Sequence, residues 1–189
     1  ATWTRGMALN LAGSPNPSVV NLLGTSGDGS IYGNIDINPT DEINVQDGTT
    51  YFDGIINPEF LPVGGVVPAT LDSRLFREGT LTIDAGGNLI LAGPRVTRDP
   101  TMYDGPSYAF VDTLDLRAPL DGDPGTIAFG LEPADGGDQV PGTYPQVFAN
   151  VAELDGTLEA RFAPANGLFA DTYFWDNVID GVTRNGTFD

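Results

Sequence analysis

The chain has 189 residues, enough for one domain, and its 26 Asp and Glu residues against eight Arg residues give a net charge of −18. It contains no Cys, no His and no Lys, which excludes disulfides, thiolate and imidazole metal ligands, His-based triads and Schiff-base lysine chemistry. Such an acidic surface argues against nucleic acid and anionic membrane as partners, because both need a basic footprint.

Glycine and proline are abundant, at 25 and 15 residues, and both disfavour helix interiors. An apolar content of 40% nevertheless supports a packed core, so short strands with many turns are predicted. No apolar run reaches the ~20 residues of a membrane-spanning helix, and we expect no membrane insertion by this segment. The first residues lack the features of a signal peptide, and we expect a mature or processed piece of a longer chain.

The N-terminal part predicts a succession of short strands. Residues 7–11 are apolar and are interpreted as a strand, and residues 30–37 alternate with period two, as a half-buried strand does. Residues 43–45 alternate again, and residues 51–56 follow a turn at Gly48. Such stretches recur every 8–12 residues or so, a spacing typical of an all-β repeat or sandwich.

Two proline-containing segments, residues 57–70 and 93–107, are predicted to be loop insertions. Proline cannot donate to a central ladder, which makes these segments poor candidates for core strands. Between them, residues 79–83 and 89–93 flank a Gly-Gly-Asn turn and are predicted to be strands. Further strands are predicted at residues 108–116 and 126–131.

The C-terminal region, residues 142–189, is predicted to hold the last coils and a cap. Gly-Thr pairs that lead into apolar residues begin here and earlier, at Gly79, Gly125, Gly142, Gly156 and Gly186. Their spacing is too irregular for a strict repeat. It is compatible with a β-helix, whose coils of roughly 20-odd residues accept insertions at their turns.

Four of these stretches resemble the distal passenger region of bacterial autotransporters, the type V secretion family with pertactin-like β-helices. They are Gly79-Thr80-Leu81-Thr82-Ile83, Gly142-Thr143-Tyr144-Pro145-Gln146-Val147-Phe148-Ala149, Gly156-Thr157-Leu158 and Asn185-Gly186-Thr187-Phe188. The resemblance covers residues 75–189. It implies export across the outer membrane of a Gram-negative bacterium and display at the cell surface.

We therefore predict a single all-β domain over residues 1–189, a right-handed parallel β-helix with two insertions and a C-terminal cap. The predicted function is non-enzymatic: a secreted adhesin or a structural, self-associating scaffold. Its predicted partners are other copies, or a host or cell-surface glycan or protein. The alternative is a polysaccharide-binding or polysaccharide-cleaving β-helix, and cleavage would use paired carboxylates.

Acidic residues in Gly-rich loops are the candidate metal ligands. Ca²⁺ takes oxygen ligands, and the candidates for it are Asp121, Asp123, Asp135 and Asp138. Their spacing fits neither an EF-hand nor the Gly-Gly-x-Gly-x-Asp repeat, and solvated Asp-Gly turns are the competing interpretation. No other cofactor and no catalytic residue is predicted.

Aromatic residues near the C-terminus are predicted to cap the open end of the β-helix core. They are Phe169, Tyr173, Phe174, Trp175 and Phe188. The alternative interpretation places Phe169 and Tyr173–Trp175 with Trp3 in a sugar-stacking platform.

Overall fold

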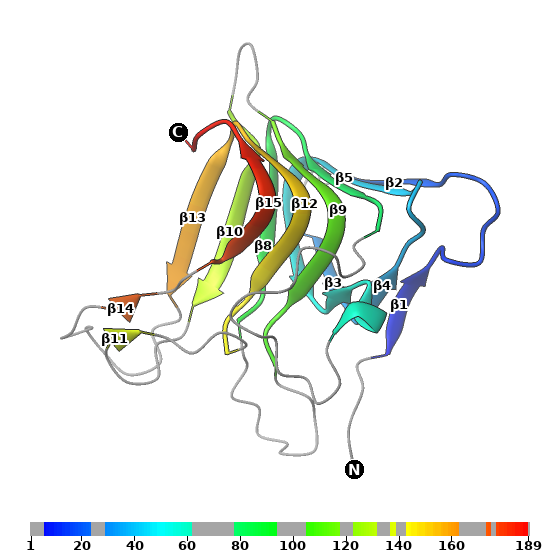
Figure 1. Ribbon diagram of the computed structural model, residues 1–189, viewed down its shortest axis with the longest axis horizontal. Helices are drawn as coiled ribbons and strands as arrows, with labels where there is room; N and C mark the ends of the chain where they lie inside the picture. The colour runs from blue at the N-terminus through cyan, green and yellow to red at the C-terminus, as the bar shows by residue number, and fades with distance from the viewer. Residues whose placement is uncertain are drawn as a thin grey trace.

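The computed structural model describes residues 6–23, 29–61, 78–93, 105–117, 123–131, 137–138, 143–162, 173–174 and 177–188 (Figure 1). Within them the protein is almost entirely β-structure, and the one helix is the short 3-10 helix η1, Pro58–Phe60. Every pairing between these strands is parallel. The predicted all-β class is confirmed.

Thirteen of the described strands form one continuous sheet, which consists of three parallel ladders. Ladder 1 contains β1 (Met7–Asn10), β4 (Asn34–Asp36), β6 (Ile55–Ile56) and the first halves of β9 (Tyr108–Leu116), β12 (Gln146–Leu154) and β15 (Ile179–Asn185). Ladder 2 contains β2 (Val19–Leu23), the first half of β5 (Glu42–Asp53), β7 (Thr80–Ile83) and the second halves of β9, β12 and β15. Ladder 3 contains β3 (Gly29–Tyr32), the second half of β5, β8 (Gly87–Leu91), β10 (Thr126–Leu131) and β13 (Thr157–Phe162). Separately, β11 (Gly137–Asp138) pairs with β14 (Tyr173–Phe174).

The chain visits these ladders in one cyclic order, from ladder 1 to ladder 2 to ladder 3 and back again. Three long strands, β9, β12 and β15, run from ladder 1 into ladder 2, and β5 runs from ladder 2 into ladder 3. We call one such circuit a layer. Successive layers add to the stack in one direction, so β1 and β2 lie at one end of it and β13 and β15 at the other (Figure 1).

Two strand boundaries differ from the sequence prediction, and glycine explains both. The single strand predicted at residues 30–37 is wrong: β3 and β4 are separate, because Gly33 takes a φ of +116° at the bend from ladder 3 to ladder 1. The turn predicted at Gly48 is present, but it does not separate two strands. There a φ of +67° turns the backbone from ladder 2 to ladder 3 within the single strand β5.

A further predicted stretch, residues 51–56, is divided at Gly54 between the end of β5 and β6. The remaining predicted strands lie where the pattern placed them. Residues 7–11 contain β1, and the segments on either side of the Gly-Gly-Asn turn are β7 and β8. These two strands do not pair with each other; each pairs with β5. Of the two predicted insertions, only residues 57–61, 93 and 105–107 belong to the described part of the chain.

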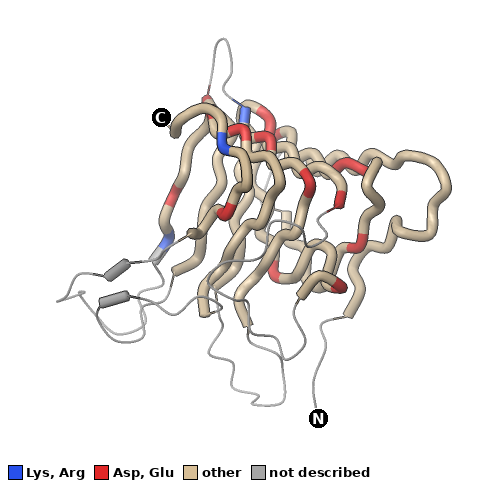
Figure 2. Tube along the Cα trace, in the orientation of Figure 1, with Lys and Arg blue, Asp and Glu red and all other residues tan. Residues whose placement is uncertain are grey.

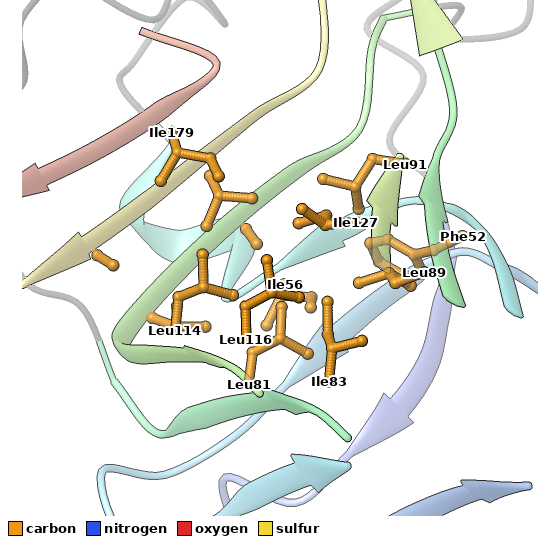
Figure 3. Packing of buried hydrophobic residues seen from close by; sticks show 14 of the residues in the cluster. Phe52, Ile56, Leu81, Ile83, Leu89, Leu91, Leu114, Leu116, Ile127 and Ile179 are labelled. Atoms are coloured by element: carbon orange, nitrogen blue, oxygen red, sulfur yellow. The ribbon is translucent and has the colours of Figure 1, made fainter. Parts of the chain in front are cut away.

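The core lies inside the three ladders, where residues in register form apolar columns (Figure 3). On ladder 2 one column contains Ile43, Leu81, Leu114 and Ala152, and the next contains Val45, Ile83, Leu116 and Leu154. All eight side chains are buried. Burial of each large aliphatic side chain stabilises the fold by about 1.5–3 kcal/mol, and each layer buries the apolar side chains of the layer before it.

The Gly-Thr pairs at Gly125 and Gly156 mark the corner between ladder 2 and ladder 3. A Cβ atom on Gly125 would meet the carbonyl oxygen of Ile83, and one on Gly156 would meet the carbonyl oxygen of Gly125. Backbone therefore packs on backbone at this corner, and only glycine fits without displacement. Each following threonine begins a ladder 3 strand, β10 or β13.

Candidate functional site

One buried asparagine at the corner between ladders 1 and 2 connects three layers. Asn57 is 0% exposed and has a left-handed backbone with φ 58°. Its Oδ1 accepts a hydrogen bond from the Ile37 N–H at 3.0 Å, and its Nδ2 donates to the carbonyl oxygens of Glu78 at 2.9 Å and Phe110 at 2.8 Å. The side chain thus satisfies three backbone groups of neighbouring segments and fixes the start and end of the insertion that follows β6.

At β6, β9 and β12, ladder 1 is buried on both of its faces. Ala109 and Val111 belong to the main core, whereas Tyr108, Phe110 and Phe148 form a second buried cluster with Ile55. The rings of Phe110 and Phe148 are stacked, with centroids 5.2 Å apart and planes 9° from parallel. The side chains of Phe60 and Leu61 pack against this second cluster. We call it the outer aromatic cluster.

The outer aromatic cluster is not among the features predicted above, although the sequence carries a signal for it. Residues 108–111 are all apolar, and an unbroken apolar run is typical of a strand that is covered on both faces. Residues 108–116 taken together alternate, which predicts a strand with one polar face. In the structure, the outer face of ladder 1 is instead apolar here, and Phe60 and Leu61 of the first insertion pack on it.

The outer face of ladder 2 is a column of polar side chains in register. Its members are Asn21, Asn44, Thr82, Asp115, Glu153 and Asn185. Asn44 donates through Nδ2 to Asn21 Oδ1 at 3.2 Å, and Asn185 donates through Nδ2 to Glu153 Oε1 at 2.8 Å. Cross-strand pairs of this kind stabilise adjacent layers from outside the core. We call it the polar column.

Arg117 lies between two acidic residues, Asp84 and Asp115, at the end of ladder 2. Arg117 donates through Nε to Asp115 Oδ2 at 2.7 Å and through Nη1 to Asp84 Oδ1 at 2.8 Å. The hydrogen bond with Asp115, opposed by partial burial and assisted by the charges of both acids, raises the pKa of the Arg117 guanidinium. Its side chain is half exposed, so each pair contributes only about 0–1 kcal/mol. Within the described residues, no three acidic side chains are grouped to hold a metal ion.

A second electrostatic feature lies on η1, beside the outer aromatic cluster. Partial burial by neighbouring residues removes water from the Glu59 carboxyl and disfavours its ionised form. The negative charges of Asp36 and Glu78 disfavour the ionised form further. The pKa of Glu59 is therefore raised above its ordinary value, although its side chain remains exposed.

Of the four Ca²⁺ candidates, only Asp123 has a described side chain, and it is exposed. Its carbonyl oxygen accepts a hydrogen bond from the Gly86 N–H at 2.9 Å, which is a turn contact. Asp138 lies in β11, but its side chain is outside the described part, as are Asp121 and Asp135 altogether. A calcium site at these residues stays a prediction.

The predicted cap residues are described only in part. Phe188 is half-buried and packs against the main core. Tyr173 and Phe174 form β14, without described side chains, and Phe169, Trp175 and Trp3 lie outside the described residues. Capping by these aromatics therefore stays a prediction, with Phe188 as the member whose packing is seen.

Comparison with known proteins identifies no relative: no family model, no curated protein and no solved structure matches this chain. In the described residues no helix is long and apolar enough to cross a membrane.

Proposed function

We propose that this chain forms a right-handed parallel β-helix and works as a non-enzymatic structural scaffold in a secreted cell-surface protein of the autotransporter passenger type. The observation that carries the proposal is the fixed cyclic order in which the chain visits three parallel ladders. A chain that winds in this way builds an elongated stack whose length grows with each layer.

The contacts between layers suit a load-bearing element. Backbone hydrogen bonds join each strand to the next layer, apolar columns fill the inside, and the polar column adds side-chain bonds outside. Because each layer contacts only its neighbours, stability accumulates along the stack.

Two further features support export and surface display. The chain has no Cys, so no oxidised loop obstructs passage through a narrow barrel. Two of the segments that resemble autotransporter passengers, at Gly79 and Gly156, lead directly into β7 and β13 of the stack. The net charge of −18 makes copies repel each other in low salt and associate more readily once salt screens the charge.

The test is direct imaging and sizing of the purified protein. Electron microscopy and sedimentation velocity in about 0.01 M and 0.15 M salt should show rod-shaped particles that form longer assemblies in the higher salt. Globular particles that stay monomeric at every protein concentration in both salts would contradict the scaffold proposal.

A polysaccharide-binding β-helix is the second candidate, and one observation favours it. On the outside of ladder 3, the Tyr32 and Tyr51 rings lie 6.2 Å apart, and Tyr32 is 60% exposed. Asp53 is in register with Tyr32, so two aromatic faces lie near a carboxylate, which suits a sugar ring. Affinity electrophoresis in gels with embedded polysaccharides should retard the natural chain and not Tyr32→Ala if this candidate is right. Equal mobility of both proteins in every polysaccharide would exclude it.

A further inference from the structure

At one end of the stack, the described strands of the first layer have open edges and exposed apolar side chains. In the described part of the chain, β1, β2 and β3 each pair on one side only, with β4 or β5. Met7, Val19 and Leu23 are 48%, 58% and 60% exposed. We call these three strands the N-terminal edge. Unpaired backbone beside exposed apolar side chains is a template for pairing with another chain.

The N-terminal edge also lacks the charge that covers the rest of the protein. Residues 6–23 and 29–32 contain no Asp, Glu, Arg or Lys, whereas the whole chain has 26 acidic residues. Figure 2 shows this layer without acidic or basic positions, in contrast to the layers that follow. Charge repulsion between acidic copies is therefore weakest at this edge.

The opposite end has matching properties. In the described residues, β13 pairs only with β10, and β15 pairs only with β12. We call β13 and β15 the C-terminal edge. Each of its cations lies beside an acid: Arg161 is 3.1 Å from Glu159, and Arg184 is 3.8 Å from Asp180. This edge is thus locally neutral.

We propose that the N-terminal edge of one copy docks on the C-terminal edge of a second copy, so that the ladders continue from one molecule into the next. The inference rests on the proposed scaffold function and names its partner and its contact surface. All the pairings are parallel, and only a head-to-tail contact continues parallel pairing; two like edges would meet antiparallel. A head-to-tail contact that does not close produces an open filament.

The registers define which residues meet. The polar column begins at Asn21 and ends at Asn185, so Asn21 of one copy lies beside Asn185 of the next. Gly186-Thr187-Phe188 repeats the order of Gly156-Thr157-Leu158, and Phe188 packs against the core. In the proposed assembly, Thr187 and Phe188 take the ladder 3 position after β13, so that β3 of the docked copy pairs with them and not with β13 directly.

Because the natural chain has no Cys, engineered cysteines report this contact without background. Neighbouring strands lie about 4.8 Å apart, within the range of about 4.4–6.8 Å between Cα atoms that a disulfide spans. A mixture of Asn21→Cys protein and Asn185→Cys protein, oxidised in about 0.15 M salt, should form a covalent dimer that contains one chain of each. The Asn21→Cys/Asn185→Cys double variant should form a ladder of oligomers, since the two positions lie at opposite ends of one molecule.

The matched control is Thr113→Cys, which lies on the same ladder in the middle of the stack. Mixed with Asn185→Cys, it should give at least tenfold less covalent dimer, and circular dichroism of each variant checks that it is folded. Disulfides that form mainly within Asn21→Cys protein alone or within Asn185→Cys protein alone would overturn the head-to-tail contact. So would a mixed dimer no more abundant than with Thr113→Cys. If sedimentation shows assembly while this cross-link fails, the docking geometry is wrong and the scaffold proposal stands; if no assembly forms, both fail.

Discussion

Replacement of Asn57 by alanine tests whether this corner amide holds neighbouring layers together. The change removes the acceptor for the Ile37 N–H and the donors for the Glu78 and Phe110 carbonyl oxygens. Asn57 is 0% exposed, so solvent does not replace these partners directly.

The magnitude follows from the groups left without partners. Each buried polar group without a hydrogen bond costs about 1–3 kcal/mol, and alanine in a left-handed backbone costs about 1–2 kcal/mol more than glycine. With three groups and a φ of 58°, Asn57→Ala should lower the free energy of unfolding by about 4–11 kcal/mol. This loss approaches the whole stability of an ordinary domain, about 5–15 kcal/mol, and the variant should be barely folded.

The assay is urea denaturation followed by circular dichroism, with two comparison variants. Asn57→Gly loses the same hydrogen bonds but adopts the backbone freely, so it should be more stable than Asn57→Ala by about 1–2 kcal/mol. Asn150→Ala removes one exposed bond, from Nδ2 to Asp112 Oδ1 at 2.7 Å, and should cost less than about 1 kcal/mol. A loss below about 2 kcal/mol for Asn57→Ala would refute the reasoning, because the freed groups would then have found other partners.

The remaining predictions concern other parts of the stack and use the same denaturation assay. Gly156→Ala should destabilise by about 1–3 kcal/mol, because the added Cβ meets backbone, whereas Gly13→Ala, which meets nothing within 4 Å, should be neutral or slightly stabilising; equal losses would contradict the corner assignment. Phe148→Ala should cost about 3–5 kcal/mol and Phe148→Leu less than about 1.5 kcal/mol, and a small loss for alanine would show that the outer aromatic cluster is not a packed core. Glu59→Gln should stabilise the protein above the raised pKa of Glu59 and have no effect below about pH 4.3, since a carboxyl that binds its proton more tightly when folded opposes folding only while it is ionised. A gain that persists at low pH would contradict that cause. An increase in salt from about 0.01 M to 0.15 M should raise Tm by screening a net charge of −18, and an unchanged Tm would show that acidic repulsion does not limit stability.

Local patterns predicted most of the strands because buried apolar residues recur at every second position in many of them. The apolar positions of β7 and β8, such as Leu81 and Leu89, were visible as short alternations between glycines. What these patterns could not show is which strands pair. β7 and β8 flank a tight turn, yet each pairs with β5, because the Gly86 and Gly87 turn is a corner between two ladders and not a hairpin.

The candidate site was harder to predict, because its residues act through contacts far along the chain. Asn57 was seen only as the start of a proline-containing loop, and its contact with the Phe110 carbonyl spans 53 residues. The outer aromatic cluster depends on which segment covers ladder 1, which periodicity within one strand does not report. Of the predicted cap, Phe188 packs on the core, and the docking proposal gives it a further role at the start of a new ladder position.

The irregular spacing of the Gly-Thr pairs has a physical explanation in the corners. The insertions follow β6 and β8, at corners between ladders, and the described strands on either side keep their register. The entropy of closing a loop rises by only about 0.6 kcal/mol for each doubling of its length, whereas an insertion within a strand would move its apolar side chains to the other face. The number of residues at a corner can therefore vary, whereas the glycine that the close backbone contact requires cannot be replaced freely. No fixed period is expected in such a chain, whereas the glycine that a close backbone contact requires recurs at the corner, as at Gly125 and Gly156. The same reasoning applies where one copy meets the next: docking needs matched registers at the two edges and places no demand on the length of chain between them.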